Sequence, residues 1–194
     1  MIRREQAERT RDALLDAAAE EFWLHGLEGA RIQDVLDRTA MTKGGLYHHF
    51  TNKVQMAEAL VELEAERWPE LIGRVETSGL RGLAALEAFA AAIADRLDGD
   101  IRSRAIVRIA GELDPPAISA FALWHDFVIL ALQQAIADGD VSDAIPIREL
   151  AQTVVECVYG ASVCPAPMSR QVAVSERLNR LWMILGAGLR STSR

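Results

Sequence analysis

Residues 43–49 concentrate side chains that can bind a polyanion: Lys43, Tyr47, His48 and His49, with Gly44 and Gly45 between them. Cations and neutral donors of this kind contact phosphates and the edges of bases. The rest of the chain offers no nucleophile with a base and an orienting group, no paired carboxylates in a plausible cleft and no phosphate-binding loop. We therefore predict a DNA-contacting segment, and expect neither catalytic residues nor a cofactor.

Two other interpretations of this segment are weaker. Tyr47 could act only as a lid on the core, but its neighbours favour DNA contact. His48 and His49 could suggest a metal site, but adjacent residues on a helix point about 100° apart and cannot easily share one ion. We expect no bound metal.

The flanking residues predict a helix-turn-helix around this segment. A helix over 32–38 is followed by a turn at 39–41, and Thr42 is a good N-cap for a helix over 43–49. Leu46 and Phe50 should point inward. Asn52 and Gln55 have the spacing of a capping box for the next helix. An earlier helix, over about 5–25, ends at Gly26 and should complete a three-helix core.

The remaining segments also have helical periodicity, over about 53–76, 81–97, 101–111, 117–138, 147–163 and 172–190. Pro69 predicts a kink or break near Trp68. We predict an all-α fold of about nine helices. Its N-terminal three-helix head, residues 1–52, should bind DNA, and residues 53–194 should form a larger helical body.

Composition limits the class of protein. The 194 residues contain no apolar run near 18 residues, so no membrane span is expected, and the start lacks the apolar stretch of a signal peptide. We expect a cytoplasmic protein. Cys157 and Cys164 lie in one apolar region and are expected to be free thiols, although their role stays open.

The net charge of −7 is unusual for a DNA-binding protein. Residues 1–53 hold 8 basic and 9 acidic side chains, so the predicted head is less acidic than the body without being basic. Local placement of a few cations suffices, because a small number of phosphate contacts dominates binding to the backbone.

The segment from Thr42 to Phe50, followed by Asn52 and Lys53, resembles the recognition-helix signature of the TetR family of transcriptional regulators. The resemblance implies a set of DNA contacts: Arg31, Gln33, Thr42, Lys43, Gly44, Gly45, Tyr47, His48, His49 and Lys53. The chain departs from the family pattern at two positions. Ala40 stands where glycine is usual, which is costly if φ is positive there. Arg31 begins the second helix where Ser or Thr is usual, which weakens the cap but offers a phosphate contact.

Trp124 is the residue most suited to a ligand pocket, because an indole can stack on a ligand and donate one hydrogen bond. With Gly139-Asp140, the valine pattern of 154–160 and residues 181–185, it resembles the γ-butyrolactone-receptor branch of that family, in which such a tryptophan lines the pocket. For every other candidate a purely structural role fits at least as well. The full set of pocket candidates is Phe89, Ile93, Ile106, Ile109, Trp124, Phe127, Val128, Val154 and Val158.

The last predicted helix carries an apolar stripe that its own chain has little left to cover. The resemblance implies a two-fold, four-helix dimer interface formed by the helices over 147–163 and 172–190. The expected interface residues are Val155, Tyr159, Leu178, Leu181, Trp182, Leu185 and Leu189.

These features predict a homodimeric repressor that binds a pseudo-palindromic DNA operator and is released by a small molecule, which the resemblance suggests is a γ-butyrolactone. The partners would be double-stranded DNA, a small hydrophobic or lactone ligand and a second copy of the chain, with no membrane. One alternative is a regulator of efflux genes that senses hydrophobic drugs, and another is a ligand-binding sink without operator binding. The sequence leaves open the ligand, the operator, the target genes and whether ligand releases or promotes DNA binding.

Overall fold

The computed structural model describes residues 2–65, 67–113, 118–163 and 172–190, and these form ten α-helices and one 3₁₀ turn. No strand occurs in these ranges, apart from an isolated bridge between Val141 and Arg190. The expected all-α fold is confirmed. Within the same ranges, every helix is too short or too polar to cross a bilayer.

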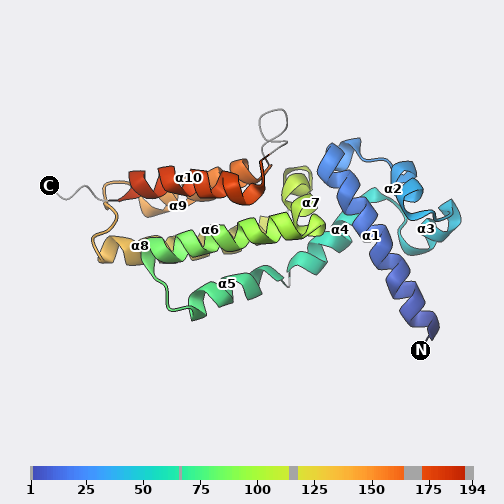
Figure 1. Cartoon of the computed structure of the whole chain (residues 1–194), viewed down its shortest axis with the longest axis horizontal. Coiled ribbons are helices and arrows are strands. Elements are labelled where there is room, and N and C mark those ends of the chain that lie inside the picture. Colours follow the sequence, from blue (N-terminus) through green and yellow to red (C-terminus); the bar gives the residue numbers. More distant parts are fainter. Residues whose placement is uncertain (1, 66, 114–117, 164–171, 191–194) are drawn as a thin grey trace. The chain divides into compact units, whose positions relative to one another are not determined.

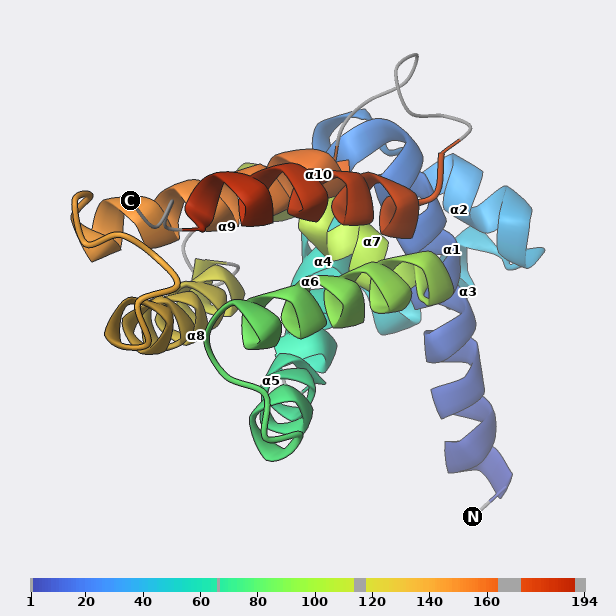
Figure 2. The ribbon, with the colours of Figure 1, turned by 60° about the vertical axis from the view of Figure 1, so that its left-hand side comes forward.

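The first compact unit contains residues 1–65 and 100–117. Its helices are α1 (Ile2–Gly29), α2 (Ile32–Thr39), α3 (Lys43–His49), α4 (Lys53–Ala65), α7 (Ile101–Ile109) and the 3₁₀ turn η1 (Ala110–Glu112). Figure 1 shows α2 and α3 on the same side of α1, and α2 packs against it, as Figure 2 also shows. One hydrophobic core joins Leu14, Leu15 and Phe22 of α1 to Leu46 of α3 and Leu60 of α4. This unit is larger than the expected head, because α4 and α7 share its core.

Gly26 interrupts α1, as its predicted role as a helix stop requires, and a further helical turn follows it. Its backbone has φ 70° and ψ 177°, a region open only to glycine. A Cβ atom there would lie 2.6 Å from Oε1 of Glu112. The other oxygen of that carboxylate accepts a hydrogen bond from the backbone N–H of Glu28 at 2.9 Å. Glu112 therefore holds the turn between α1 and α2 in place.

Two polar contacts join α7 to its neighbours in the first unit. Arg102 donates to Asp16 of α1 at 2.6 Å. The buried hydroxyl of Ser103 donates to the buried carboxylate of Glu64, on α4, at 2.8 Å. Burial raises the cost of breaking the Ser103–Glu64 bond, because neither partner can turn to water instead. These bonds fix α7 against both α1 and α4.

The second compact unit contains residues 66–99 and 118–194. Its described helices are α5 (Arg67–Thr77), α6 (Gly82–Gly99), α8 (Ile118–Ala137), α9 (Ile147–Val163) and α10 (Val174–Leu189). Figures 1 and 2 show α10 and α9 running side by side, with α6 between α10 and α5. The N-terminus of α10 is capped by Asp98, which accepts from the N–H groups of Val174 and Ser175 at 2.9 and 3.0 Å.

The helix expected over 53–76 is divided into α4 and α5, and residue 66 between them lies outside the described residues. Pro69 sits at the third position of α5, where its missing N–H removes no helical hydrogen bond. The predicted break near Trp68 therefore lies before Arg67, and Pro69 is in the first turn of α5. The helix expected over 101–111 is α-helical only as far as Ile109, and the 3₁₀ turn η1 follows it directly.

Candidate functional site

The inner face of α3 is anchored in the core of the first unit. Leu46 is completely buried and Phe50 nearly so, as predicted. Thr42 caps the helix by accepting from the N–H of Gly45 at 3.2 Å. The following helix is capped by Asn52, which accepts from the N–H of Gln55 at 2.9 Å, while the Gln55 side chain accepts from the N–H of Thr51 at 2.7 Å. Capping at both helices fixes where α3 begins and ends.

The outer face of α3 presents the predicted donors to solvent. Lys43, Gly44 and His48 are exposed, and the Tyr47 ring is 44% exposed, which does not suit a lid on the core. A Cβ at Gly44 would meet nothing within 4 Å, whereas one at Gly45 would lie 3.1 Å from the Met41 side chain. Gly45 is therefore needed for packing inside the turn, and Gly44 leaves the backbone open to an approaching surface.

Ala40 adopts the left-handed conformation, with φ 52° and ψ 25°. It is the one residue other than glycine with a positive φ in the described part of the chain. The sequence departure at this position thus coincides with a backbone conformation that alanine adopts at a cost of about 1–2 kcal/mol. The turn between α2 and α3 keeps its shape despite this strain.

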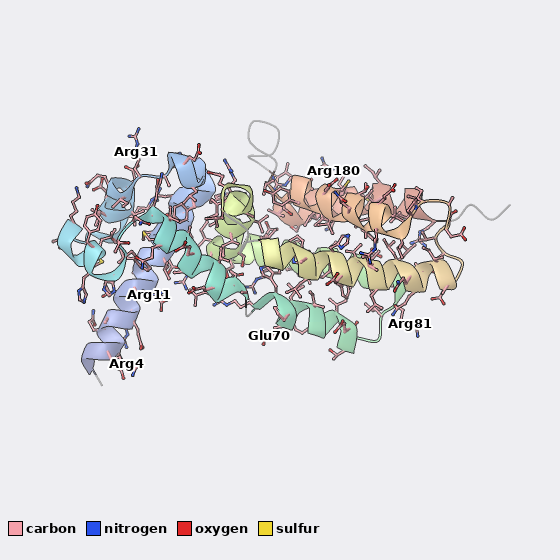
Figure 3. All side chains as sticks on the ribbon, turned by 180° about the vertical axis from the view of Figure 1, so that it is seen from behind. Arg4, Arg11, Arg31, Glu70, Arg81 and Arg180 are labelled. Carbon is pink, nitrogen blue, oxygen red and sulfur yellow. The ribbon has the colours of Figure 1, made fainter. Side chains whose placement is uncertain are left out.

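Arg31 and Gln33 lie at the start of α2. Arg31 is the N-cap residue and makes no side-chain capping bond, as its type predicts. Its side chain is exposed and projects from the ribbon in Figure 3. Gln33 is also exposed, and its amide donates to Asp37 at 2.9 Å on the same helix. Both side chains lie on the surface, with Arg31 the more available to a phosphate.

Lys53 has a structural role that the sequence did not indicate. Its ammonium donates to the carbonyl oxygens of Glu28 and Ala30 at 2.7 and 3.3 Å. These bonds join the start of α4 to the turn before α2. Among the ten predicted DNA contacts, Lys53 is thus the one whose charge is already engaged within the chain.

His48 and His49 touch edge to face, with ring centroids 5.4 Å apart. Partial burial lowers the pKa of His49, and the neighbouring positive charges of His48 and Arg11 lower it further. Arg11 itself lies over the Phe50 ring, 5.3 Å from its centroid. In the described residues, no three His, Cys, Asp or Glu side chains gather as metal ligands.

An ion pair that sequence reasoning missed holds α2 against α1. Arg38 contacts Glu21 at 2.7 Å and Glu20 at 2.7 Å, and Glu21 is only 2% exposed. The two carboxylates raise the pKa of Arg38, chiefly through its hydrogen bond to Glu21. Glu21 is buried but Arg38 is 37% exposed, so water screens the pair and makes it weaker than a fully buried one. Arg38 therefore orients the helix that precedes the exposed face of α3.

A cavity of about 10 Å³ lies in the second unit and is lined by apolar and aromatic side chains. Five of the nine pocket candidates line it: Phe89, Trp124, Val128, Val154 and Val158. Trp124 meets Trp68 and Phe89 edge to face, with centroids 4.9 and 5.9 Å apart. The lining also includes Val155 and Trp182, which the sequence assigned to the dimer interface.

The other four pocket candidates lie elsewhere. Ile106 and Ile109 belong to the core of the first unit, where α7 packs against α1, so they do not line this cavity and have the structural role that was the alternative. Ile93 is buried in the second unit without lining the cavity. Phe127 packs against Phe89 with centroids 4.6 Å apart, one layer outside it.

The predicted dimer residues divide between the inside and the outside of the chain. Leu178 and Trp182 are buried within a single copy, so they offer little apolar surface to a partner. Val155, Tyr159, Leu181, Leu185 and Leu189 are half-buried. The most exposed large apolar side chains on α10 are Met183 and Ile184, at 69% and 67%, which the sequence stripe did not include. Cys157 is a free, half-buried thiol, whereas Cys164 lies outside the described residues.

Residues 14–60 match the family model described as bacterial regulatory proteins, tetR family. The chain is 25% identical over 173 residues to the probable HTH-type transcriptional regulator ArpR of Pseudomonas putida, covering 82% of each protein. It is similar to a solved gamma-butyrolactone receptor (ArpA-like protein), with 27% identity, a TM-score of 0.75 and coverage of 97% of this chain and 92% of that one.

A second structural match is CprB of Streptomyces coelicolor in complex with its biological operator sequence. The identity is 28% and the TM-score 0.79, with coverage of 96% of this chain and 91% of that one. Both structural matches extend over nearly the whole chain, whereas the family model covers only part of the first unit.

Proposed function

The chain belongs to the TetR family of bacterial regulatory proteins, and from this we propose that it is a homodimeric repressor that a small ligand releases from its operator. One observation carries the proposal: α3 buries Leu46 in a rigid core while it presents Lys43, Gly44, Tyr47 and His48 to solvent. A helix fixed on one face and rich in donors on the other is suited to the major groove.

We assign DNA binding to residues 1–52. Lys43, Tyr47 and the backbone at Gly44 would contact base edges and phosphates, with His48 and His49 beside them and Arg31 on the flanking phosphate. Thr42 and Gly45 support this surface by capping and packing, and the exposed Gln33 would contact DNA beside Arg31. The solved complex of CprB with its operator supports DNA binding by this chain.

We assign ligand binding and dimerisation to residues 53–194. The cavity beside Trp124 would receive the apolar part of the ligand. We infer a γ-butyrolactone-type ligand rather than the varied drugs that an efflux regulator senses. The match to a gamma-butyrolactone receptor supports the same ligand class.

A dimer would form through α9 and α10. Met183 and Ile184 expose apolar surface, and Cβ atoms at Gly160 and Gly188 would meet nothing within 4 Å, which leaves room for a close helix. Two heads read a two-fold operator with half-sites about one helical turn apart. Dimerisation also compensates for the few cations on each head.

Ligand binding would be coupled to DNA release through α4. The chain passes from α4 of the first unit to α5 of the second, and α4 begins at the Lys53 contact with the turn before α2. A ligand that favours one position of α4 shifts the population of heads that can engage both half-sites.

Fluorescence anisotropy of the DNA upstream of the protein's own gene tests the proposal. Wild-type protein should bind specifically, and Lys43→Met and Tyr47→Ala should each weaken specific binding. The exposed Arg180→Met, on α10, serves as the control. No binding to this DNA or to a random-sequence selection would contradict the repressor and favour the ligand sink.

A further inference from the structure

The cavity beside Trp124 is too small to be a complete ligand site. Its volume of about 10 Å³ is close to the space that a single water molecule needs. Pockets for small organic ligands usually measure about 300–1,000 Å³. A ligand that reaches Trp124 must therefore occupy additional space in the same unit.

A larger hollow of about 400 Å³ lies in the second unit, between the turn joining α5 to α6 and the second half of α8. Leu80 and Leu130 line it and are 44% and 47% exposed. Figure 3 shows Arg81, another lining residue, at this turn. The hollow combines an apolar wall with a polar edge, which is the composition of a small-molecule site.

The polar edge offers hydrogen-bond donors. Oε1 of Gln134 accepts from the N–H of Gly82 at 3.3 Å, which leaves the NH₂ group of that amide for a ligand. The guanidinium of Arg81 supplies further donors. Glu76 also lines the hollow and would repel a carboxylate. Because Arg81 and Glu76 carry opposite charges, the edge has no net charge and suits an uncharged oxygen acceptor.

Phe127 separates the hollow from the cavity. Its ring lines the hollow and packs against Phe89, with centroids 4.6 Å apart. Phe89 lines the cavity and contacts Trp124. The two volumes thus share the Phe127–Phe89 ring contact as part of their linings.

We propose that the hollow is the outer, polar half of the ligand site, and that Phe127 gates its inner half. The ligand is an uncharged amphiphile whose carbonyl oxygen, from a lactone, ester or ketone, accepts from Arg81 and Gln134, with its alkyl chain directed past Phe127 toward Trp124. This inference rests on the proposed ligand response and names the chemistry of that site.

Calorimetric titration of the full-length protein with γ-nonalactone, and with nonanoate as the charged comparison, tests the proposal without DNA. γ-Nonalactone should bind more tightly than nonanoate. Arg81→Met should weaken lactone binding about tenfold, as expected for loss of a hydrogen bond to a charged donor. Arg74→Met, on the exposed face of α5 outside the hollow, is the matched control and should bind like the wild type.

Phe127→Leu tests the gate with a substitution that keeps the site apolar. It should speed lactone association in stopped-flow tryptophan fluorescence, since Trp68 and Trp124 lie at the inner end of the path. Leu123→Ala, also on α8, is the control, and circular dichroism confirms that both variants fold.

The proposal is overturned if neither probe saturates the wild type, if Arg81→Met binds the lactone as the wild type does, or if nonanoate binds more tightly. An unchanged association rate in Phe127→Leu overturns the gate. Because these titrations contain no DNA, they test the ligand site separately from the repressor function. If the protein bound no operator but still bound lactone in an Arg81-dependent way, the repressor proposal would be contradicted and the ligand site would be supported.

Discussion

The ammonium nitrogen of Lys53 lies 2.7 Å from the carbonyl oxygen of Glu28, so the first residue of α4 is bonded to the turn that precedes α2. Glu112 holds the same turn by accepting from the N–H of Glu28. The turn is therefore fixed from two elements, α4 and η1, and each is linked along the chain to a helix of the second unit. A displacement of either element would act directly on the position of α2.

Lys53→Met should lower the free energy of unfolding by about 1–2 kcal/mol, because it removes two hydrogen bonds from a charged donor. It should also weaken DNA binding by disordering the turn before α2. Lys43→Met is the matched control: Lys43 is exposed on α3, so its loss should weaken DNA binding without changing stability. Urea denaturation and anisotropy titrations measure both quantities. Equal stability of the two variants would contradict the structural role of Lys53.

Ala40→Gly should raise the free energy of unfolding by about 0.5–1 kcal/mol, because glycine adopts the positive φ of this turn without steric cost. Ala13→Gly, at an exposed position inside α1, should lower it by about 1 kcal/mol. The same substitution should thus change the free energy of unfolding in opposite directions at the two positions, as measured by urea denaturation. A destabilised Ala40→Gly would show that the turn gains nothing from a residue without a side chain.

Two opposite pH effects are expected at His49. Its pKa is lowered in the folded chain, so below about pH 6.5, the ordinary pKa of histidine, the unfolded chain binds more protons and stability falls. DNA phosphates near His49 would raise that pKa, so operator affinity should rise as the pH falls from 7 toward 6.

His49→Asn removes the titrating group and should flatten both pH profiles, with His25→Asn, on α1, as the control. Thermal melts and anisotropy titrations between pH 5.5 and 8 supply the two measurements. A wild-type affinity that does not change with pH would place His49 away from the phosphates.

Ile184→Glu should convert the dimer to a monomer, because it places a charge in the exposed apolar surface proposed as the interface. Ile145→Glu, in the connection between α8 and α9 and also exposed, should stay dimeric. Sedimentation velocity measures both. A dimeric Ile184→Glu with wild-type stability would show that the copies associate through another surface.

The head could be predicted from the sequence because its signals are local. The bounds of α3, the cap at Thr42 and the inward side chains of Leu46 and Phe50 depend on residues within one or two turns of one another. The strain at Ala40 could also be predicted, because alanine stands there where glycine is usual. The role of Lys53 did not follow, because the carbonyls that it contacts lie more than 20 residues earlier in the chain.

The body was harder to predict because its helices are apolar on more than one face. In α10, residues 181–185 are all hydrophobic, so periodicity could not decide whether Trp182 or Ile184 points outward. Ile106 and Ile109 have the type and spacing of pocket residues, yet α7 packs them against α1. Which neighbour a helix face packs against depends on contacts between residues far apart in the sequence, and a local pattern does not specify these contacts.

Release of operator DNA by a lactone is the most direct test of the central claim. A labelled operator is titrated with wild-type protein and with Trp124→Phe, each with and without a panel of γ-butyrolactones. We predict that a lactone lowers the affinity of the wild type for DNA and that Trp124→Phe binds DNA normally but needs more lactone for release. Equal DNA affinity with and without every lactone at saturation would contradict the account, since a ligand without preference between free and bound repressor cannot release it.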